Sequence, residues 1–389
     1  MQMVYKKIFL IILIIFALIS FCSCESPGTE LSELMIMQGI GVDVTADGYR
    51  VCVEILNNEQ SGSPGGDGNS ENKTKIYSAD GDSVADALRK LITKSGNLPL
   101  FAHNRVIIIG EAATRDKLTD VIDFFERNYD SRASQLLCVA KKATAEEIIR
   151  AKLLSDGVKS EILENLLEES FNQSLVPRVR IIDAVNYLKD ETSFLCMPSI
   201  KIEKSGENEN YVLDGCALFG KDSRLASYID SETAEGVAFL NDKIEKGVIT
   251  AQLPNLQNAT FLINKGKTTV RISEENGVLH YMVHIKISCD LDEVEGAEYF
   301  NKDNGVLETF QRAAGEKVCA LSENTLMVLK ENKGGDAVRF GRRLRLSNPD
   351  LYKKYKNDWA NTFKQTKTSI TADVTIRRIG EETFHSTKK

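Results

Sequence analysis

The sequence lacks the short motifs that identify common enzyme classes. It contains no G-x-S-x-G, no P-loop, no H-E-x-x-H and no G-x-G-x-x-G that opens a helix after a strand. Gly39-Ile40-Gly41 is too short to indicate catalysis, and the paired carboxylates have the spacing of ordinary helix-surface acids. We therefore predict a protein without catalytic activity and without a cofactor.

Histidine is scarce, with four in 389 residues. His280 and His284 have the i, i+4 spacing of a helical zinc site, but residues 280–287 alternate in the manner of a strand. In a strand the two histidines would be about 13 Å apart at ~3.3 Å per residue, too far to share one zinc ion. His103 precedes an apolar strand, where it could act as a base, but we favour a role in a local hydrogen-bond network.

No C-x-x-C pair is present among the eight cysteines. Cys22 and Cys24 lie near the N-terminus, and the other six are widely spread, so we predict no metal site. We interpret these six as small buried hydrophobes; scattered disulfides are the alternative in an oxidising compartment. They are Cys52, Cys138, Cys196, Cys216, Cys289 and Cys319.

A basic surplus is also missing. The formal net charge is −7, and removal of Lys6 and Lys7 with a signal peptide would bring it to about −9. A nucleic-acid-binding protein normally shows the opposite balance, so we predict no nucleic-acid partner.

Long hydrophobic runs are absent except at the N-terminus. There, residues 8–20 form a run of thirteen uncharged, mostly apolar residues after Lys6 and Lys7. As a helix this run would be about 20 Å long at ~1.5 Å per residue, which is short for a bilayer core of roughly 30 Å. A basic flank, a short apolar core and a small residue before the cut predict a secretory signal that is removed.

The end of this run looks like the lipobox of bacterial lipoproteins, in which a cysteine receives a diacylglycerol and becomes the new N-terminus. Cleavage before Cys22 would put bulky Phe21 at the cut, whereas cleavage before Cys24 puts small Ser23 there. We therefore predict lipidation of Cys24 and a signal peptide at residues 1–23. The alternative is a plain signal peptide or an uncleaved anchor. A single acyl chain binds a membrane only marginally, but the two or three of a lipoprotein hold it firmly.

The mature chain is predicted to be α+β, with mixed sheets flanked by helices in three domains. The first, residues 24–198, is an α/β domain that includes a polar, Gly- and Ser-rich mobile loop at 57–75. Its strands are expected at 34–44, 49–56, 76–78, 105–110 and 134–140, and its helices at 83–93, 116–128, after Thr144, and at 159–171. The strand at 105–110 is continuously apolar, which predicts a central position covered on both faces.

The second domain, residues 199–295, is predicted to be rich in strands, and the third, residues 296–389, to be α+β. Strands are expected at 199–203, 211–219, 223–229, 248–253, 259–263, 268–273, 278–290 and 369–379. A helix is expected at 232–240. The third domain, from about residue 296, is expected to open with a helical pattern that runs to 331, and a further helical stretch is expected from 337 to 363 with an interruption at Asn348-Pro349.

Residues 339–356 form a basic segment with seven basic residues, one acid and interleaved aromatic and aliphatic side chains. Near an anionic membrane each basic residue contributes about 1 kcal/mol, and an acidic partner would attract the segment equally. The alternative is a solvated helix face beside a core stripe. The candidate partner- or membrane-binding residues are Arg339, Arg342, Arg343, Arg345, Lys353 and Lys354.

Several separated blocks in the right order resemble the Ger(x)C family, the lipoprotein C subunits of nutrient germinant receptors in endospore-forming bacteria. The most specific is residues 101–111 (FAHNRVIIIGE). The others are 30–34 (ELSEL), 37–43 (MQGIGVD), 123–127 (DFFER), 214–219 (DGCALF), 339–342 (RFGR) with Asn348-Pro349 and Trp359, and 374–378 (VTIRR). One departure is Glu25, which stands where the family usually has an aromatic residue.

The resemblance covers nearly the whole chain and implies a non-enzymatic, three-domain α+β protein. It would lie on the outer face of the spore inner membrane with a polytopic A-type subunit and a transporter-like B-type subunit. It carries no catalytic or ligand-binding residue onto this chain. The alternatives are a solute-binding lipoprotein of a membrane importer, which needs two similar lobes around a cleft, and a secreted hydrolase, which needs an acid–base pair in a cleft.

Overall fold

The computed structural model describes Tyr5 and residues 33–57, 73–128, 130–154, 157–254, 257–295, 304–332, 335–379 and 382–383. Met35–Lys389 forms one compact unit and Met1–Leu34 another. The predicted signal peptide, Cys24, His385 and most of the expected loop at 57–75 lie outside the described residues.

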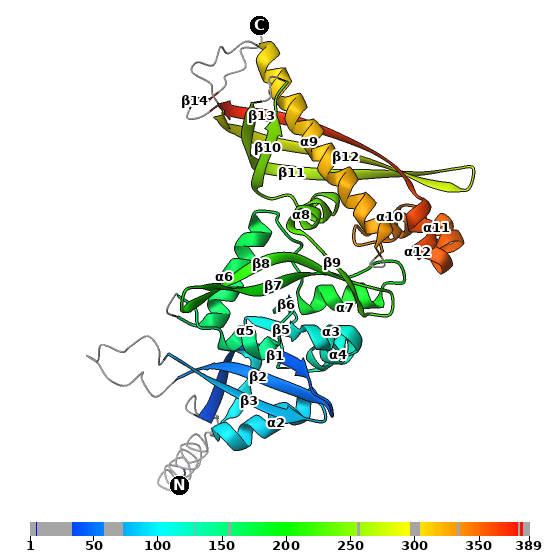
Figure 1. Ribbon diagram of the computed structural model, residues 1–389. Helices are drawn as coiled ribbons and strands as arrows, with labels where there is room; N and C mark the ends of the chain where they lie inside the picture. The colour runs from blue at the N-terminus through cyan, green and yellow to red at the C-terminus, as the bar shows by residue number, and fades with distance from the viewer. Residues whose placement is uncertain are drawn as a thin grey trace. The chain divides into compact units, whose positions relative to one another are not determined.

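Nine strands form a mixed sheet, eight of them in the order β3-β2-β1-β5-β6-β7-β8-β9 (Figure 1). Strand β4 pairs with β1. The pairs β1–β5, β5–β6 and β6–β7 are parallel, and the flanking pairs β1–β2, β2–β3, β7–β8 and β8–β9 are antiparallel. The strands are β1 (Leu34–Val44), β2 (Tyr49–Leu56), β3 (Thr74–Gly81), β4 (Leu98–Leu100), β5 (Val106–Gly110), β6 (Leu136–Ala140), β7 (Cys196–Ser205), β8 (Asn208–Phe219) and β9 (Leu225–Ile229).

Strand β5 is central, and all five of its residues are buried. Ile107 and Ile109 belong to one hydrophobic cluster, whereas Val106 and Ile108 belong to another, as expected where successive side chains point to opposite faces. The first cluster includes side chains of α2 (Val84–Ser95), α4 (Leu118–Arg127) and α7 (Ile181–Lys189), and the second those of α5 (Ala145–Arg150) and α6 (Lys159–Asn172). The prediction of a strand covered on both faces is confirmed.

Buried carboxylates of the first two strands fix where two helices begin. Asp43 accepts hydrogen bonds from the backbone N–H groups of Ala145 (2.7 Å) and Glu146 (3.0 Å) at the start of α5. Glu54 accepts from the N–H groups of Lys159 (3.0 Å) and Ser160 (2.7 Å) at the start of α6. Each carboxylate satisfies orphan donors of a first helical turn.

A second sheet has the order β10-β11-β12-β13-β14. Its strands are β10 (Gly247–Gln252), β11 (Asn258–Glu275), β12 (Val278–Val294), β13 (Lys367–Ile379) and β14 (Glu382–Thr383). Strand β13 is parallel to β12, and the other pairs are antiparallel. Helix α8 (Ser231–Leu240) precedes this sheet, and α9 (Asn304–Glu331) packs on β13, where its Gln311 Oε1 accepts the N–H of Ile376 (3.0 Å).

The predicted α+β class with mixed sheets and flanking helices is confirmed, with local differences. Strand β11 is continuous across 258–275, where two strands were predicted, and α7 was not predicted at all. Strands β7 to β9 complete the first sheet, so the expected boundary after residue 198 falls within β7. The three-domain division stays a prediction.

All six cysteines of the described region are free thiols. Five are buried and Cys319 is partly buried, in agreement with their interpretation as small hydrophobes. Burial raises the pKa of the Cys138 thiol well above its ordinary value, which makes it a poor nucleophile.

Candidate functional site

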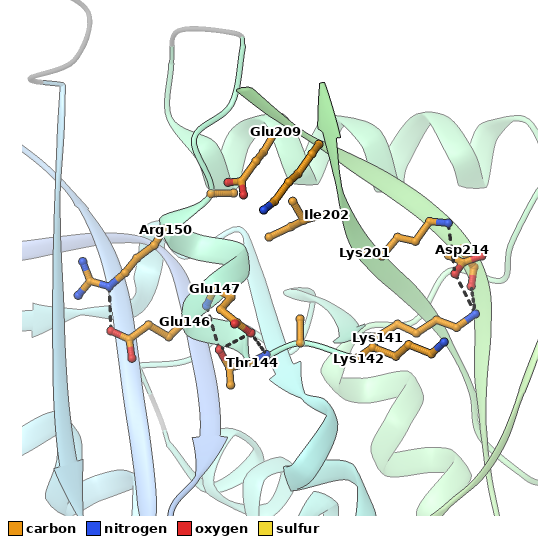
Figure 2. A pocket seen from close by; sticks show the side chains of 13 residues that line it. Lys141, Lys142, Thr144, Glu146, Glu147, Arg150, Lys201, Ile202, Glu209 and Asp214 are labelled. Carbon is orange, nitrogen blue, oxygen red and sulfur yellow. Dashed lines mark hydrogen bonds and ion pairs between the residues drawn. The ribbon is translucent and has the colours of Figure 1, made fainter. Parts of the chain in front are cut away.

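A hollow of about 820 Å³ opens beside the end of β6 (Figure 2). We call it the Lys141 pocket. Its walls are the β6–α5 loop, α5, and the paired strands β7 and β8. It is lined by Lys141, Lys142, Ala143, Thr144, Glu146, Glu147, Arg150, Ala151, Lys201, Ile202, Lys204, Glu209 and Asp214.

The position of the pocket follows from the sheet topology. Parallel strands β5 and β6 end together at Gly110 and Ala140, and ligands of open α/β sheets bind beyond the carboxyl ends of such strands. The loop then turns into α5 through a capping box. There the Thr144 hydroxyl accepts the N–H of Glu147 (3.1 Å), and the Glu147 carboxylate accepts the N–H of Thr144 (2.7 Å).

Each carboxylate of the pocket already has an internal partner. Asp214 pairs with Lys141 at 3.0 Å and Lys201 at 3.7 Å, and Glu146 pairs with Arg150 at 2.8 Å (Figure 2). Burial opposes ionisation of Asp214, but the bonds from Lys141 outweigh it and hold its pKa below the ordinary value. Glu209 accepts the N–H of Lys152 at 2.7 Å.

The two lysines Lys142 and Lys204 have no ion pair within the part of the chain that the structure describes. The pocket therefore carries an excess of positive charge and attracts anions. The only hydroxyl among the lining side chains, that of Thr144, donates to the Glu147 carboxylate (3.0 Å) within the capping box.

The basic segment folds into α10 (Phe340–Ser347) and α11 (Pro349–Tyr355) and ends at the 3-10 helix Lys356–Asp358, which α12 (Trp359–Gln365) follows. Most of its predicted binding residues contact the protein itself. Arg343 is partly buried and donates to the carbonyl of Leu240 (2.6 Å). The guanidinium of Arg339 lies 4.4 Å from the centroid of the Tyr187 ring.

The remaining candidates of the segment lie nearer the surface. Arg345 pairs with Asp190 (3.3 Å), Lys353 with Asp350 (3.1 Å) and Lys354 with Glu274 (2.5 Å). No ion pair of Arg342 is found among the described residues. Arg342 and Lys353 are therefore the candidates most available to a partner, because Arg342 has no ion pair among the described residues and Lys353 pairs only with an exposed acid of the same segment.

The carboxylate of Asp336 holds the basic segment in place by hydrogen bonds. This residue was not identified from the sequence. This fully buried carboxylate accepts the N–H groups of Phe340 (2.9 Å) and Gly341 (2.7 Å) and the indole N–H of Trp359 (3.0 Å). Gly341 is required because a Cβ there would lie 2.4 Å from Thr192 Cβ and 2.8 Å from the Trp359 ring. In the sequence, the only indication of this role is the position of Asp336, three residues before the block at 339–342.

The histidines lie where the alternation predicted. His280 and His284 are both on β12, which confirms a strand, and His284 contacts Thr371 Oγ1 (3.0 Å) and Asp373 Oδ2 (3.2 Å). His103 is exposed at the end of the 3-10 helix Phe101–His103. Among the described residues, no group of three His, Cys, Asp or Glu side chains could hold a metal ion.

Neither Cys24 nor the apolar run before it can be placed, because both lie outside the described residues. Across the described residues, no helix has the length and apolar character needed to span a bilayer.

Comparison with known proteins assigns both halves of the chain. Residues 28–202 match the family described as spore germination protein N-terminal domain, and residues 214–380 match spore germination B3/GerAC like, C-terminal. Spore germination protein KC of Bacillus subtilis is 25% identical, with 96% of each chain covered. Spore germination protein B3 of the same organism is 22% identical, with 90% of this chain and 92% of that protein covered.

A solved structure shares the fold. The crystal structure of the GerBC protein aligns with a TM-score of 0.57 and 21% identity, covering 89% of this chain and 99% of that one. The chain belongs to the Ger(x)C family. Its relatives are spore germination proteins, and its role lies in spore germination.

Proposed function

We propose that this chain is a non-enzymatic lipoprotein subunit of a membrane germinant receptor complex, required for nutrient-triggered spore germination. The observation that carries the proposal is the ordered match of both halves to the two spore germination domains. The Lys141 pocket supports a binding role, because Lys142 and Lys204, which have no ion pair among the described residues, attract anions.

The proposed anchor is a diacylglycerol on Cys24, which holds the protein on the extracytoplasmic face of the spore inner membrane. The proposed partners are a polytopic A-type subunit and a transporter-like B-type subunit. The importer alternative is less well supported, because it needs two similar lobes, whereas the two sheets differ in strand number and order.

Dipicolinate release from spores tests the proposal. Spores that lack this chain should fail to release dipicolinate in response to one class of nutrient, and the wild-type gene should restore release. Cys24→Ala should restore it poorly, because the protein loses its membrane anchor. Cys22→Ala is the matched control and should restore release fully.

Two results would count against the proposal. Normal release to every nutrient, in a strain that also lacks sister receptors, would mean that the chain is not a required subunit. Full function of Cys24→Ala together with failure of Cys22→Ala would move the lipid to the other cysteine.

Arg342 and Lys353 are the best test of the basic segment as a partner face. The double change Arg342→Glu and Lys353→Glu should weaken co-purification with the A- and B-type subunits at least tenfold and leave thermal unfolding unchanged. Reversal of Asp350 to lysine is the control, since it changes the same surface in the opposite sense. If the double variant assembles normally, the segment is a solvated helix face.

A further inference from the structure

A second, smaller cleft is lined by Arg339, whose Nε–H has no hydrogen-bond acceptor and whose charge has no ion-pair partner among the described residues. The cleft has a volume of about 200 Å³ and lies between the end of α6, the start and middle of α7, the stretch after α8, and the residue before α10. We call it the Arg339 cleft. Its positive side chains are Arg178, Arg180, Lys243 and Arg339.

Arg339 is unusual in two respects. Its Nε–H is buried and has no acceptor, although buried donors in folded proteins are nearly always paired. Its backbone is left-handed, with φ 60° and ψ 34°, a conformation that costs energy for any residue with a Cβ. The ring of Tyr187 lies against the guanidinium and holds its plane in place.

The charges of the cleft leave one positive charge unbalanced. Arg178 is paired with Glu168, and Arg180 is paired with Asp183 at 2.7 Å. Among the described residues, Arg339 and Lys243 have no ion pair, and the only lining carboxylate without one is Glu245. Two cations against one acid leave a charge of +1, which a ligand with a single negative charge would neutralise.

The remaining walls limit the kind of anion. Phe171, Val176 and Pro177 line the cleft, and Phe171 and Val176 are almost fully buried. The planar guanidinium fork matches a carboxylate. Only 6% of Phe171 and 2% of Val176 are exposed, so the apolar wall has room for a hydrocarbon body of only a few carbons. A volume of 200 Å³ is below the range of drug-sized ligand pockets, so the ligand has few atoms.

We propose that the Arg339 cleft binds a small organic monocarboxylate, with the carboxylate on Arg339 and Lys243 and the apolar body against Phe171 and Val176. The lining combines residues from 171–187 with residues from 241–245 and Arg339. A bound ligand would therefore join the helices of the first sheet to the elements that lead into the second.

Thermal unfolding of the full chain in detergent micelles, with sodium butyrate as the probe, tests this assignment. Butyrate at tens of millimolar should raise Tm of the wild type above that in sodium chloride of equal ionic strength. Arg339→Gly should abolish the shift, and Lys243→Gln should reduce it. Arg339→Gly suits the test because glycine adopts the left-handed backbone without strain, so loss of binding is not confused with loss of folding.

Arg342→Gln is the matched control, because Arg342 lies in the first turn of α10, three residues after Arg339, and does not line the cleft. It should keep the full shift. A wild type that responds equally to butyrate and chloride would overturn the proposal, as would a shift that survives in Arg339→Gly. A shift with inorganic phosphate but not with butyrate would assign the cleft to phosphate and refute the monocarboxylate.

Discussion

Replacing Ile107 with aspartate should prevent the first sheet from forming. Ile107 is fully buried at the centre of β5, between β1 and β6. The change removes a well-packed apolar side chain and puts an unpaired carboxylate in its place. Each of these effects costs several kcal/mol, and their sum is comparable to the total stability of about 5–15 kcal/mol.

The measurement is the yield of soluble protein together with its circular dichroism and thermal unfolding. Ile182→Asp is the matched control, because it makes the same chemical change on α7 at a side chain that is 41% exposed. We expect that control to behave as wild type. Soluble Ile107→Asp with a cooperative transition would show that β5 is not central to the sheet.

Asp336→Ala should destabilise the protein by roughly 3–5 kcal/mol, since it leaves three buried N–H donors without an acceptor. The donors belong to α10 and to Trp359, so the loss should loosen the whole basic segment. Urea unfolding at fixed pH measures the effect. Asp350→Ala, at an exposed position of the same segment, should change the free energy of unfolding by no more than about 0.5 kcal/mol.

The contribution of Asp336 should also depend on pH. Burial raises the pKa of Asp336 to about 6, although its three N–H donors and Arg343 act in the opposite direction. The folded state therefore holds more protons than the unfolded state between pH 4 and 6, and the free energy of unfolding falls as pH rises through this window. At ~1.4 kcal/mol per pKa unit, the advantage of wild type over Asp336→Ala should shrink by about 2 kcal/mol between pH 4.5 and 7. An advantage that grows over that range would show that the carboxylate is stabilised in its ionised form.

Local patterns predicted the elements whose partners are near in sequence. The strands predicted at 34–44 and 49–56 are β1 and β2, and in the short turn between them the N–H of Thr45 donates to the carbonyl of Gly48 (2.9 Å). Thr144 caps α5, with the acids of its first turn in place. Both signals are short, and the hydrogen bonds that they predict close within four residues.

The errors arose where tertiary contacts decide the structure. Separate strands were predicted at 259–263 and 268–273, but β11 continues through the residues between them with an irregularity at Ile263–Lys265. Gly266 is there because Ile244 packs against the strand, and a Cβ would lie 2.5 Å from the Ile244 side chain. Helix α7 was missed because its N-cap is Arg180, and arginine is not a common capping residue. The Arg180 backbone and side chain are bonded instead to Asp183.

The candidate sites likewise depend on contacts between residues that are far apart in the sequence. The basic segment was visible as charge, but Arg343 and Arg345 contact Leu240 and Asp190, which are far away in sequence. No local pattern indicates which arginine forms these long-range contacts. The Arg339 cleft also brings together residues that are far apart in the sequence, since Tyr187 and Lys243 line it with Arg339.

The parallel pairing of β13 with β12 has a consequence for biosynthesis. Residues 295–366 separate the two strands in the sequence. The ribosome therefore finishes β12, a 17-residue strand, long before the strand that covers its edge exists. Until then the half-made protein exposes a long template for pairing with other chains. A nascent chain stalled before Lys367 is thus the form of this protein that most needs a chaperone.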